Sequence, residues 1–135
     1  MEKKLEILLV DDDEMTLFIH EKIMQRCELK TPYRSFNSAQ LCLDYLSRDD
    51  DDSKLFLLLL DINMPGMSGW EMLEYLESDL NHLNILVIMA TSSVDFEDRK
   101  RAEKFEFVID FIEKPFSINI CKELLTIPQI AALNG

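Results

Sequence analysis

The part of the sequence that most strongly constrains the fold is residues 55–69, which read LFLLLLDINMPGMSG. Its first six residues are all apolar, the pattern of a β-strand that other elements cover on both faces. Asp61 ends this run, and a proline and glycines follow it. Ser68, three residues before Glu71, is typical of a capping box at the start of a helix. The stretch therefore predicts a buried strand, a turn that carries a carboxylate, and a helix.

The same order of strand and helix recurs along the chain, and this alternation predicts a parallel sheet with helices on both faces. We expect one α/β domain over residues 1–135. Because Pro128 interrupts the last apolar repeat, we expect a short helix from about Ser117 and an irregular tail over 127–135. The expected apolar stripe of the first helix is Met15, Phe18, Ile19, Ile23 and Cys27. The five expected strands are Leu5–Val10, Thr31–Phe36, Leu55–Leu60, Ile85–Ala90 and Val108–Ile112.

The charge and the apolar content of the chain limit the kinds of molecule that it is expected to bind. The chain has 14 basic and 26 acidic side chains, which gives a net charge of −12. Nucleic acids and anionic membranes attract cationic surfaces, so we expect binding to neither. No apolar run approaches the ~20 residues of a membrane helix, and the N-terminal pattern is not that of a secretory signal. We therefore expect a cytoplasmic protein whose acidic balance favours a cationic ligand such as a divalent metal.

The three cysteines, Cys27, Cys42 and Cys121, are widely spaced and include no C-x-x-C pair. Each lies in an apolar segment with helical spacing. Small, reduced core residues explain such cysteines well. We therefore expect all three to be reduced, which in turn suggests a reducing compartment.

Two further groups of polar residues have structural rather than chemical interpretations. The run Asp49–Asp52 lies between a predicted helix and a predicted strand. It lacks the glycine and the glutamate that a calcium-binding loop requires, so we expect a solvated loop. We expect His20 and His82 to be solvated helix or loop residues, not phosphoryl donors.

Chemically active side chains collect at the carboxyl ends of the predicted strands, where ligands bind in open parallel sheets. Asp11 and Asp12 follow the first strand, Asp61 follows the third, Thr91 the fourth and Lys114 the fifth. If the first and third strands are neighbours, their carboxylates converge. Two carboxylates ~4 Å apart repel by about 4 kcal/mol at an effective dielectric of 20. A hard divalent cation relieves this repulsion, and Mg²⁺ fits because it binds carboxylates together with water and phosphate oxygens.

The residues around this predicted metal site indicate phosphoryl chemistry. A metal, the ammonium of Lys114 and the hydroxyl of Thr91 together match the three oxygens of a phosphoryl group. Asp61 could be the nucleophile, because aspartate forms aspartyl-phosphates in covalent catalysis. A flavin phosphate is disfavoured, because its loops need glycine and hydroxyl residues where this chain has carboxylates. Structural alternatives stay open, namely helix caps for Asp11, Asp12 and Thr91, a turn position for Asp61 and a surface ion pair for Lys114.

Four of these segments, in this order, resemble the receiver domain of two-component response regulators. They are Val10-Asp11-Asp12, Leu60 to Gly69, Ala90-Thr91-Ser92 and Phe111 to Phe116. The resemblance covers residues ~4 to ~126. It implies a flavodoxin-like, doubly wound sheet of five parallel strands in the order 2-1-3-4-5.

The resemblance also implies a role for each acidic residue of the site. Asp61 would accept a phosphoryl group from a phosphohistidine of a sensor histidine kinase or a phosphotransfer protein. Mg²⁺ would be held by Asp12, Asp61 and the backbone carbonyl of Asn63. Asp11 would bind the metal through a water molecule.

The remaining implied roles concern the phosphoryl oxygens and the response to phosphorylation. Lys114 would pair with a phosphoryl oxygen, and its bond to Pro115 is expected to be cis, which proline tolerates. Thr91 and Phe111 would form a switch that changes the surface around the fourth helix and the fifth strand. Phe111 could instead be an ordinary core aromatic.

The implied protein is a regulator that promotes its own phosphotransfer and dephosphorylation, not an enzyme. We expect a stand-alone receiver, a monomer or weak dimer, whose output comes from a partner protein. One alternative is a degenerate receiver that never carries phosphate and acts only as an interaction module. Another is a haloacid-dehalogenase-like phosphatase, but that class needs a second acid two residues after the nucleophile, where this chain has Asn63.

Overall fold

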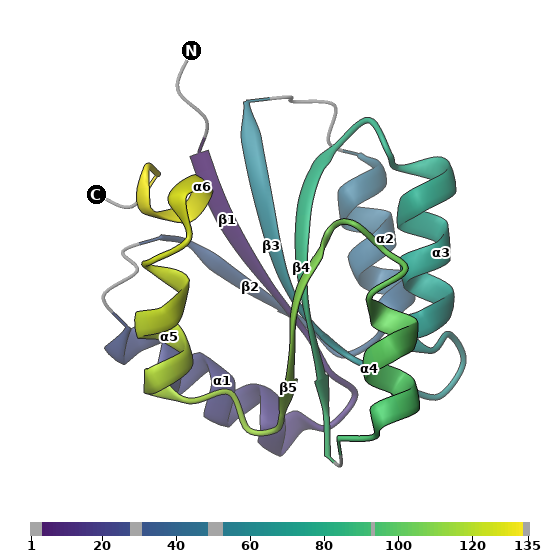
Figure 1. Ribbon diagram of the computed structural model, residues 1–135, viewed down its shortest axis with the longest axis horizontal. Helices are drawn as coiled ribbons and strands as arrows, with labels where there is room; N and C mark the ends of the chain where they lie inside the picture. The colour runs from purple at the N-terminus through teal and green to yellow at the C-terminus, as the bar shows by residue number, and fades with distance from the viewer. Residues whose placement is uncertain (1–3, 28–30, 49–52, 93, 134–135) are drawn as a thin grey trace.

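The computed structural model describes residues 4–27, 31–48, 53–92 and 94–133 (Figure 1). Its five strands are all parallel and form one sheet in the order β2-β1-β3-β4-β5. This confirms the expected doubly wound topology. The strands are β1 Lys4–Val10, β2 Tyr33–Phe36, β3 Lys54–Asp61, β4 Asn84–Thr91 and β5 Val108–Glu113.

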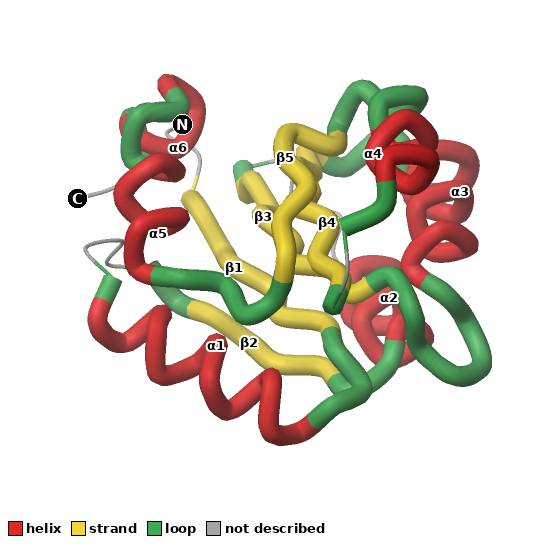
Figure 2. The backbone as a smooth tube through the Cα atoms, turned by 60° about the horizontal axis from the view of Figure 1, so that its bottom comes forward, coloured by secondary structure: helices red, strands yellow, loops and turns green. Residues whose placement is uncertain are grey.

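Helices cover both faces of the sheet (Figure 2). The helices α1, α5 and α6 lie over one face, and α2, α3 and α4 lie over the other. No helix within the described ranges has the length and apolarity needed to cross a membrane. The helices are α1 Glu14–Arg26, α2 Ala39–Ser47, α3 Gly69–Asp79, α4 Phe96–Ala102, α5 Ile118–Leu124 and α6 Pro128–Ala131.

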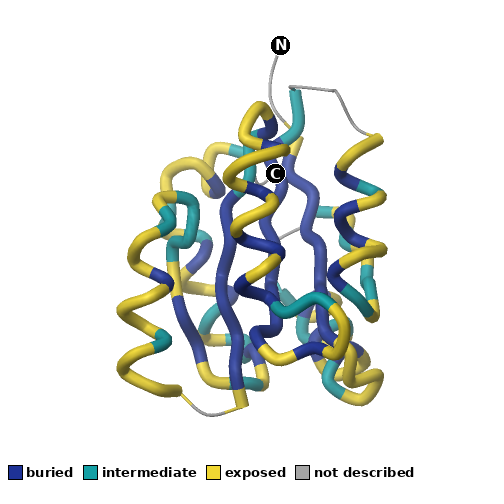
Figure 3. The backbone as a smooth tube through the Cα atoms, turned by 90° about the vertical axis from the view of Figure 1, so that its right-hand side faces the viewer, coloured by how far each residue is buried: buried dark blue, intermediate teal, exposed yellow. Residues whose placement is uncertain are grey.

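Strand β3 lies at the centre of the sheet and explains its continuous apolar run. Side chains alternate between the two faces of a strand, so a strand covered on both sides needs apolar residues at every position. Figure 3 shows the buried strands between helices whose outer faces are exposed. Leu58 and Leu60 pack with α2 and α3, whereas Leu57 and Leu59 pack with α1 and α5.

The side-chain cap predicted for the start of α3 is present. Ser68 accepts a hydrogen bond from the backbone N–H of Glu71 at 3.2 Å, which confirms the expected start of α3. The prediction of an irregular C-terminal tail was wrong for residues 128–131, because these residues form α6. Proline is favoured in the first turn of a helix, where its missing N–H costs nothing, and the apolar side chain of Ile130 is fully buried there.

The buried face of α1 also differs from the predicted stripe. Met15 and Phe18 are exposed, whereas Leu17, His20 and Met24 are buried. These three residues are spaced by three and four positions, so they share one face of the helix. The buried face was not predicted from apolar spacing because its middle residue, His20, is polar.

The expectation that all three cysteines are reduced was wrong for two of them. Cys27 and Cys121 form a disulfide whose Cα atoms are 5.9 Å apart. The two residues are 94 positions apart in the chain, and they meet only because α1 and α5 cover the same face of the sheet. Cys42 is free and buried, as expected.

Gly69 is a position where only hydrogen fits, and we expect Gly69→Ala to be strongly destabilising. An added Cβ atom would lie 2.4 Å from the backbone oxygen of Asp61 and 3.0 Å from the Cα of Ile62. Because both contacts are to backbone, relief requires α3 to shift, and we expect a loss of roughly 3 kcal/mol in urea unfolding. Gly66→Ala is the control. Its φ is +81° with open space around it, so we expect a loss of about 1 kcal/mol; equal losses would contradict the packing argument.

Candidate functional site

The candidate site lies at the carboxyl edge of the sheet. Strands β1 and β3 are paired with Val10 opposite Leu60, so Asp11 and Asp61 emerge side by side from neighbouring strands. Lys114 follows β5, and its backbone N–H donates to the carbonyl of Thr91 at 2.7 Å. The parallel topology thus brings together residues that are far apart in the sequence.

Lys114 forms ion pairs with two carboxylates at once. Its Nζ lies 3.0 Å from Oδ2 of Asp11 and 3.1 Å from Oδ1 of Asp61. The Lys114 side chain is only 15 % exposed and both carboxylate side chains are 3 % exposed. A surface ion pair, the structural alternative for Lys114, does not describe this buried arrangement.

Three carboxylates are close enough to share one cation. Asp11, Asp12 and Asp61 each offer an oxygen, and these oxygens lie within 4.8 Å of one another. Asp11 and Asp61 are buried while Asp12 is exposed, so the cluster is open to solvent on one side. An all-oxygen donor set with access for water or phosphate suits Mg²⁺. Asn63, the other expected metal contact, follows β3 and is exposed.

The charges of the site perturb its titration. Burial and the nearby charge of Asp11 raise the pKa of Asp61 from 3.8 to about 6, although Lys114 opposes the shift. Burial would lower the pKa of Lys114, but its hydrogen bonds to Asp11 and Asp61 outweigh burial and raise it. The positive charge of Lys114 therefore does not fully offset the negative charge of the carboxylates. A bound cation would add positive charge and favour the ionised form of Asp61.

The helix-cap alternatives for the site residues are not realised. The N-cap of α1 is Asp13, whose side chain accepts from Met15 N at 3.0 Å and from the Thr16 hydroxyl at 3.0 Å. Asp11 instead accepts from Asp13 N at 2.9 Å, which fixes the turn that presents it. The N-cap of α4 is Asp95, so Thr91 is not a cap; it is buried at the end of β4.

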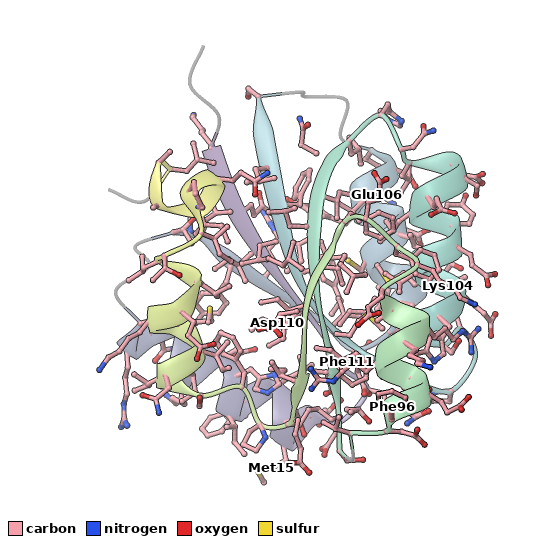
Figure 4. All side chains as sticks on the ribbon, viewed as in Figure 1. Met15, Phe96, Lys104, Glu106, Asp110 and Phe111 are labelled. Carbon is pink, nitrogen blue, oxygen red and sulfur yellow. A yellow bond between two sulfur atoms is a disulfide. The ribbon has the colours of Figure 1, made fainter. Side chains whose placement is uncertain are left out.

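Phe111 belongs to β5, on the side of the strand that faces α4 (Figure 4). Its ring is buried in the core cluster on that face of the sheet. The guanidinium of Arg99 lies 5.7 Å from the ring centroid, and Arg99 Nη2 donates to the Phe111 carbonyl at 3.5 Å. In this structure Phe111 is therefore a core aromatic that also joins β5 to α4.

The peptide bond between Lys114 and Pro115 is cis, as expected. Two other expectations have different outcomes. His82 is exposed, as predicted. The solvated loop expected over Asp49–Asp52 lies outside the described residues.

The prediction that the His20 side chain is solvated was wrong. Its side chain is 2 % exposed, and its Nε2 accepts a hydrogen bond from the backbone N–H of Phe116 at 3.0 Å. Burial lowers the pKa of His20 from 6.5 to about 4. The residue thus connects α1 to the segment just after Lys114. Its spacing from Leu17 and Met24 was the one sequence signal that pointed to a buried position.

We expect His20 to make folding stability depend on pH. Its neutral form is favoured in the folded state, so its contribution is complete above pH 6.5 and is lost as pH falls from 6.5 toward 4. This linkage amounts to about 2 kcal/mol between pH 7 and pH 5. In urea unfolding, His20→Gln should lack that portion of the pH dependence, because glutamine does not titrate. The exposed control, His82→Gln, should retain it; parallel behaviour of the two variants would refute the assignment.

The chain matches the family model for the response regulator receiver domain over residues 7–126, and it therefore belongs to this family. Receiver domains are signalling switches of two-component systems and are phosphorylated by histidine kinases or phosphotransfer proteins.

Curated relatives include larger proteins. Heme response regulator HssR of Staphylococcus epidermidis is 33% identical over 118 residues, which cover 87% of this chain and 47% of the relative. Chemotaxis protein CheV2 of Helicobacter pylori is 30% identical over 100 residues, which cover 74% of this chain and 31% of the relative. The chain thus spans about half the length of HssR and less of CheV2.

Solved structures support the same fold. A response regulator receiver protein from Dyadobacter fermentans matches with a TM-score of 0.76 and 32% identity, covering 90% of this chain and 94% of that one. A two component response regulator from Cytophaga hutchinsonii matches with a TM-score of 0.79 and 23% identity, covering 97% and 99% of the two chains. The second likeness concerns the fold alone.

Proposed function

We propose that this protein is a phosphorylatable switch in which Asp61 accepts a phosphoryl group from a phosphohistidine of a sensor histidine kinase or a phosphotransfer protein. The observation that carries the proposal is the position of Lys114, 3.1 Å from Asp61 and 3.0 Å from Asp11, beside a cluster of three carboxylates. The cluster supplies a nucleophile, and the lysine supplies a fixed positive charge for a phosphoryl oxygen.

The donor set supports a role for Mg²⁺ held by Asp12, Asp61 and the backbone carbonyl of Asn63, with Asp11 bound through water. When bound, the metal would offset the negative charge of the phosphoryl group. Because Asp12 is exposed and the other two carboxylates are buried, a donor would approach from the side of Asp12.

In the transfer, an oxygen of the Asp61 carboxylate forms a bond to phosphorus while the bond between phosphorus and the donor imidazole nitrogen breaks. The imidazole leaves as the neutral ring after taking up a proton. Lys114 already contacts Asp61, so a small movement of its ammonium would pair it with a phosphoryl oxygen. Thr91 lies at the end of the adjacent β4, and its hydroxyl would donate a hydrogen bond to a second phosphoryl oxygen.

Phosphorylation of Asp61 would change the surface of the protein through movements of residues in β4 and β5. A phosphoryl group adds negative charge and strong hydrogen-bond acceptors, which draw nearby donors such as Thr91. Lys114 N is bonded to the Thr91 carbonyl at 2.7 Å, and Phe111 is tied to α4 through Arg99. Movement of Thr91 and Phe111 would therefore alter the surface formed by α4 and β5, which a partner protein would read.

The test is incubation with Mg²⁺ and acetyl phosphate, followed by intact mass measurement. We expect the mass gain of one phosphoryl group, dependent on Mg²⁺ and prevented by a chelator. A degenerate receiver would show no gain under any condition. A phosphatase would instead turn over a phosphate ester such as p-nitrophenyl phosphate, and either result would overturn the proposal.

A further inference from the structure

We propose that Cys27 and Cys121 form a reversible redox-modification site, oxidised by a low-molecular-weight disulfide, that fastens helix α5 to helix α1. The site lies outside the acidic cluster and concerns a different chemistry. Its two cysteines come from opposite ends of the chain, 94 positions apart.

The fold holds the two cysteines in bonding position. Cys27 is the C-cap of α1, where its backbone N–H donates to the Met24 carbonyl at 3.2 Å. Cys121 lies within α5, and its side chain is buried in the core cluster shared by α1 and α5. The Cα separation of 5.9 Å falls in the range that a disulfide spans without backbone movement. In Figures 1 and 2, α1 and α5 lie side by side.

The two cysteines differ in access to solvent, which sets the order of the reaction. Cys27 is partly exposed and Cys121 is buried, so the Cys27 thiolate would attack the disulfide of oxidised glutathione. A mixed disulfide forms and one glutathione thiolate leaves. The Cys121 thiolate then attacks the Cys27 sulfur and releases the second glutathione. The protein thiols lose two protons and two electrons in total, and oxidised glutathione gains them to become two thiols.

The bond would act on a helix that is otherwise lightly anchored. α5 has seven residues, of which Cys121 and Leu124 are buried. The segment before it is held by the hydrogen bond from Phe116 N to His20, and Phe116 follows Lys114 by two residues. Oxidation therefore attaches α5 itself to α1, five residues after the hydrogen bond that links Phe116 to His20. The disulfide also closes a long loop of the chain, which lowers the conformational entropy of the unfolded state.

The experiment compares the full chain after treatment with oxidised glutathione and after full reduction. Oxidation should remove two hydrogens from the intact mass and leave one titratable thiol in denaturant, that of Cys42. We expect the oxidised protein to melt about 10 °C higher than the reduced protein. Amide exchange in α5 should be at least ~10-fold slower in the oxidised form.

Two variants keep the test specific. Cys27→Ser should melt like the reduced protein in both conditions, whereas Cys42→Ala should keep the difference between them. The proposal is overturned if oxidised glutathione removes no hydrogens, if the bond involves Cys42, or if melting and exchange are the same in both redox states. None of these readouts uses phosphorylation, so failure here is distinct from failure of the proposed switch.

Discussion

Asp61→Asn is expected to abolish the phosphoryl adduct completely. The substitution keeps the size of the side chain but replaces the carboxylate that we propose as the nucleophile with an amide, which does not form a stable phosphoryl bond. Asp11 and Asp12 remain in place, so the loss tests the identity of the acceptor and not the presence of the acidic cluster. The measurement is intact mass after incubation with Mg²⁺ and acetyl phosphate.

The loss should not come from misfolding. Asp61 is buried beside Asp11, and their repulsion contributes to the raised pKa of Asp61. Asparagine removes that repulsion while Lys114 keeps its ion pair with Asp11, so we expect a melting temperature at least equal to that of the wild type. Asp79→Asn is the matched control, because Asp79 is exposed at the far end of α3; it should be phosphorylated like the wild type. A full adduct in Asp61→Asn would show that another residue is the acceptor.

Asp12→Asn is expected to weaken Mg²⁺ binding on the order of 100-fold, because it would remove a charged oxygen that we propose as a ligand of a small, hard cation. Asp12 is exposed, so the substitution should leave the folded core unchanged. Isothermal titration calorimetry with Mg²⁺ measures the effect directly. Asp79→Asn has the same change in net charge and should retain the wild-type affinity. Equal losses in the two variants would mean that Mg²⁺ responds to overall charge and that the site is misplaced.

The central features of the fold could be predicted because several signals agreed. The uninterrupted apolar run before Asp61 required a strand covered on both faces, and the spacing of Ser68 and Glu71 marked the following helix. The candidate site could be predicted for a related reason. In a parallel sheet the carboxyl ends of all strands lie at one edge, so Asp11, Asp61 and Lys114, which end or follow β1, β3 and β5, are brought to the same edge.

The sequence did not reveal features that depend on how helices rotate and pack. The buried face of α1 was missed because His20 is polar by type yet is satisfied by a backbone N–H from a distant segment. The disulfide was missed because nothing local links Cys27 to Cys121. Pro128 interrupts the apolar repeat of the preceding segment, but the same residue begins a new helix, α6.

The identity of the phosphoryl acceptor is tested most directly by locating the phosphoryl group in the chain. Reduction of the phosphorylated protein with borohydride converts an aspartyl phosphate to homoserine, which peptide mass spectrometry assigns to a position. We predict homoserine at position 61 alone, and only in samples that received both Mg²⁺ and acetyl phosphate. Homoserine at position 11 or 12, or a phosphoryl group retained on a histidine or serine, would contradict the role of Asp61 as the phosphoryl acceptor.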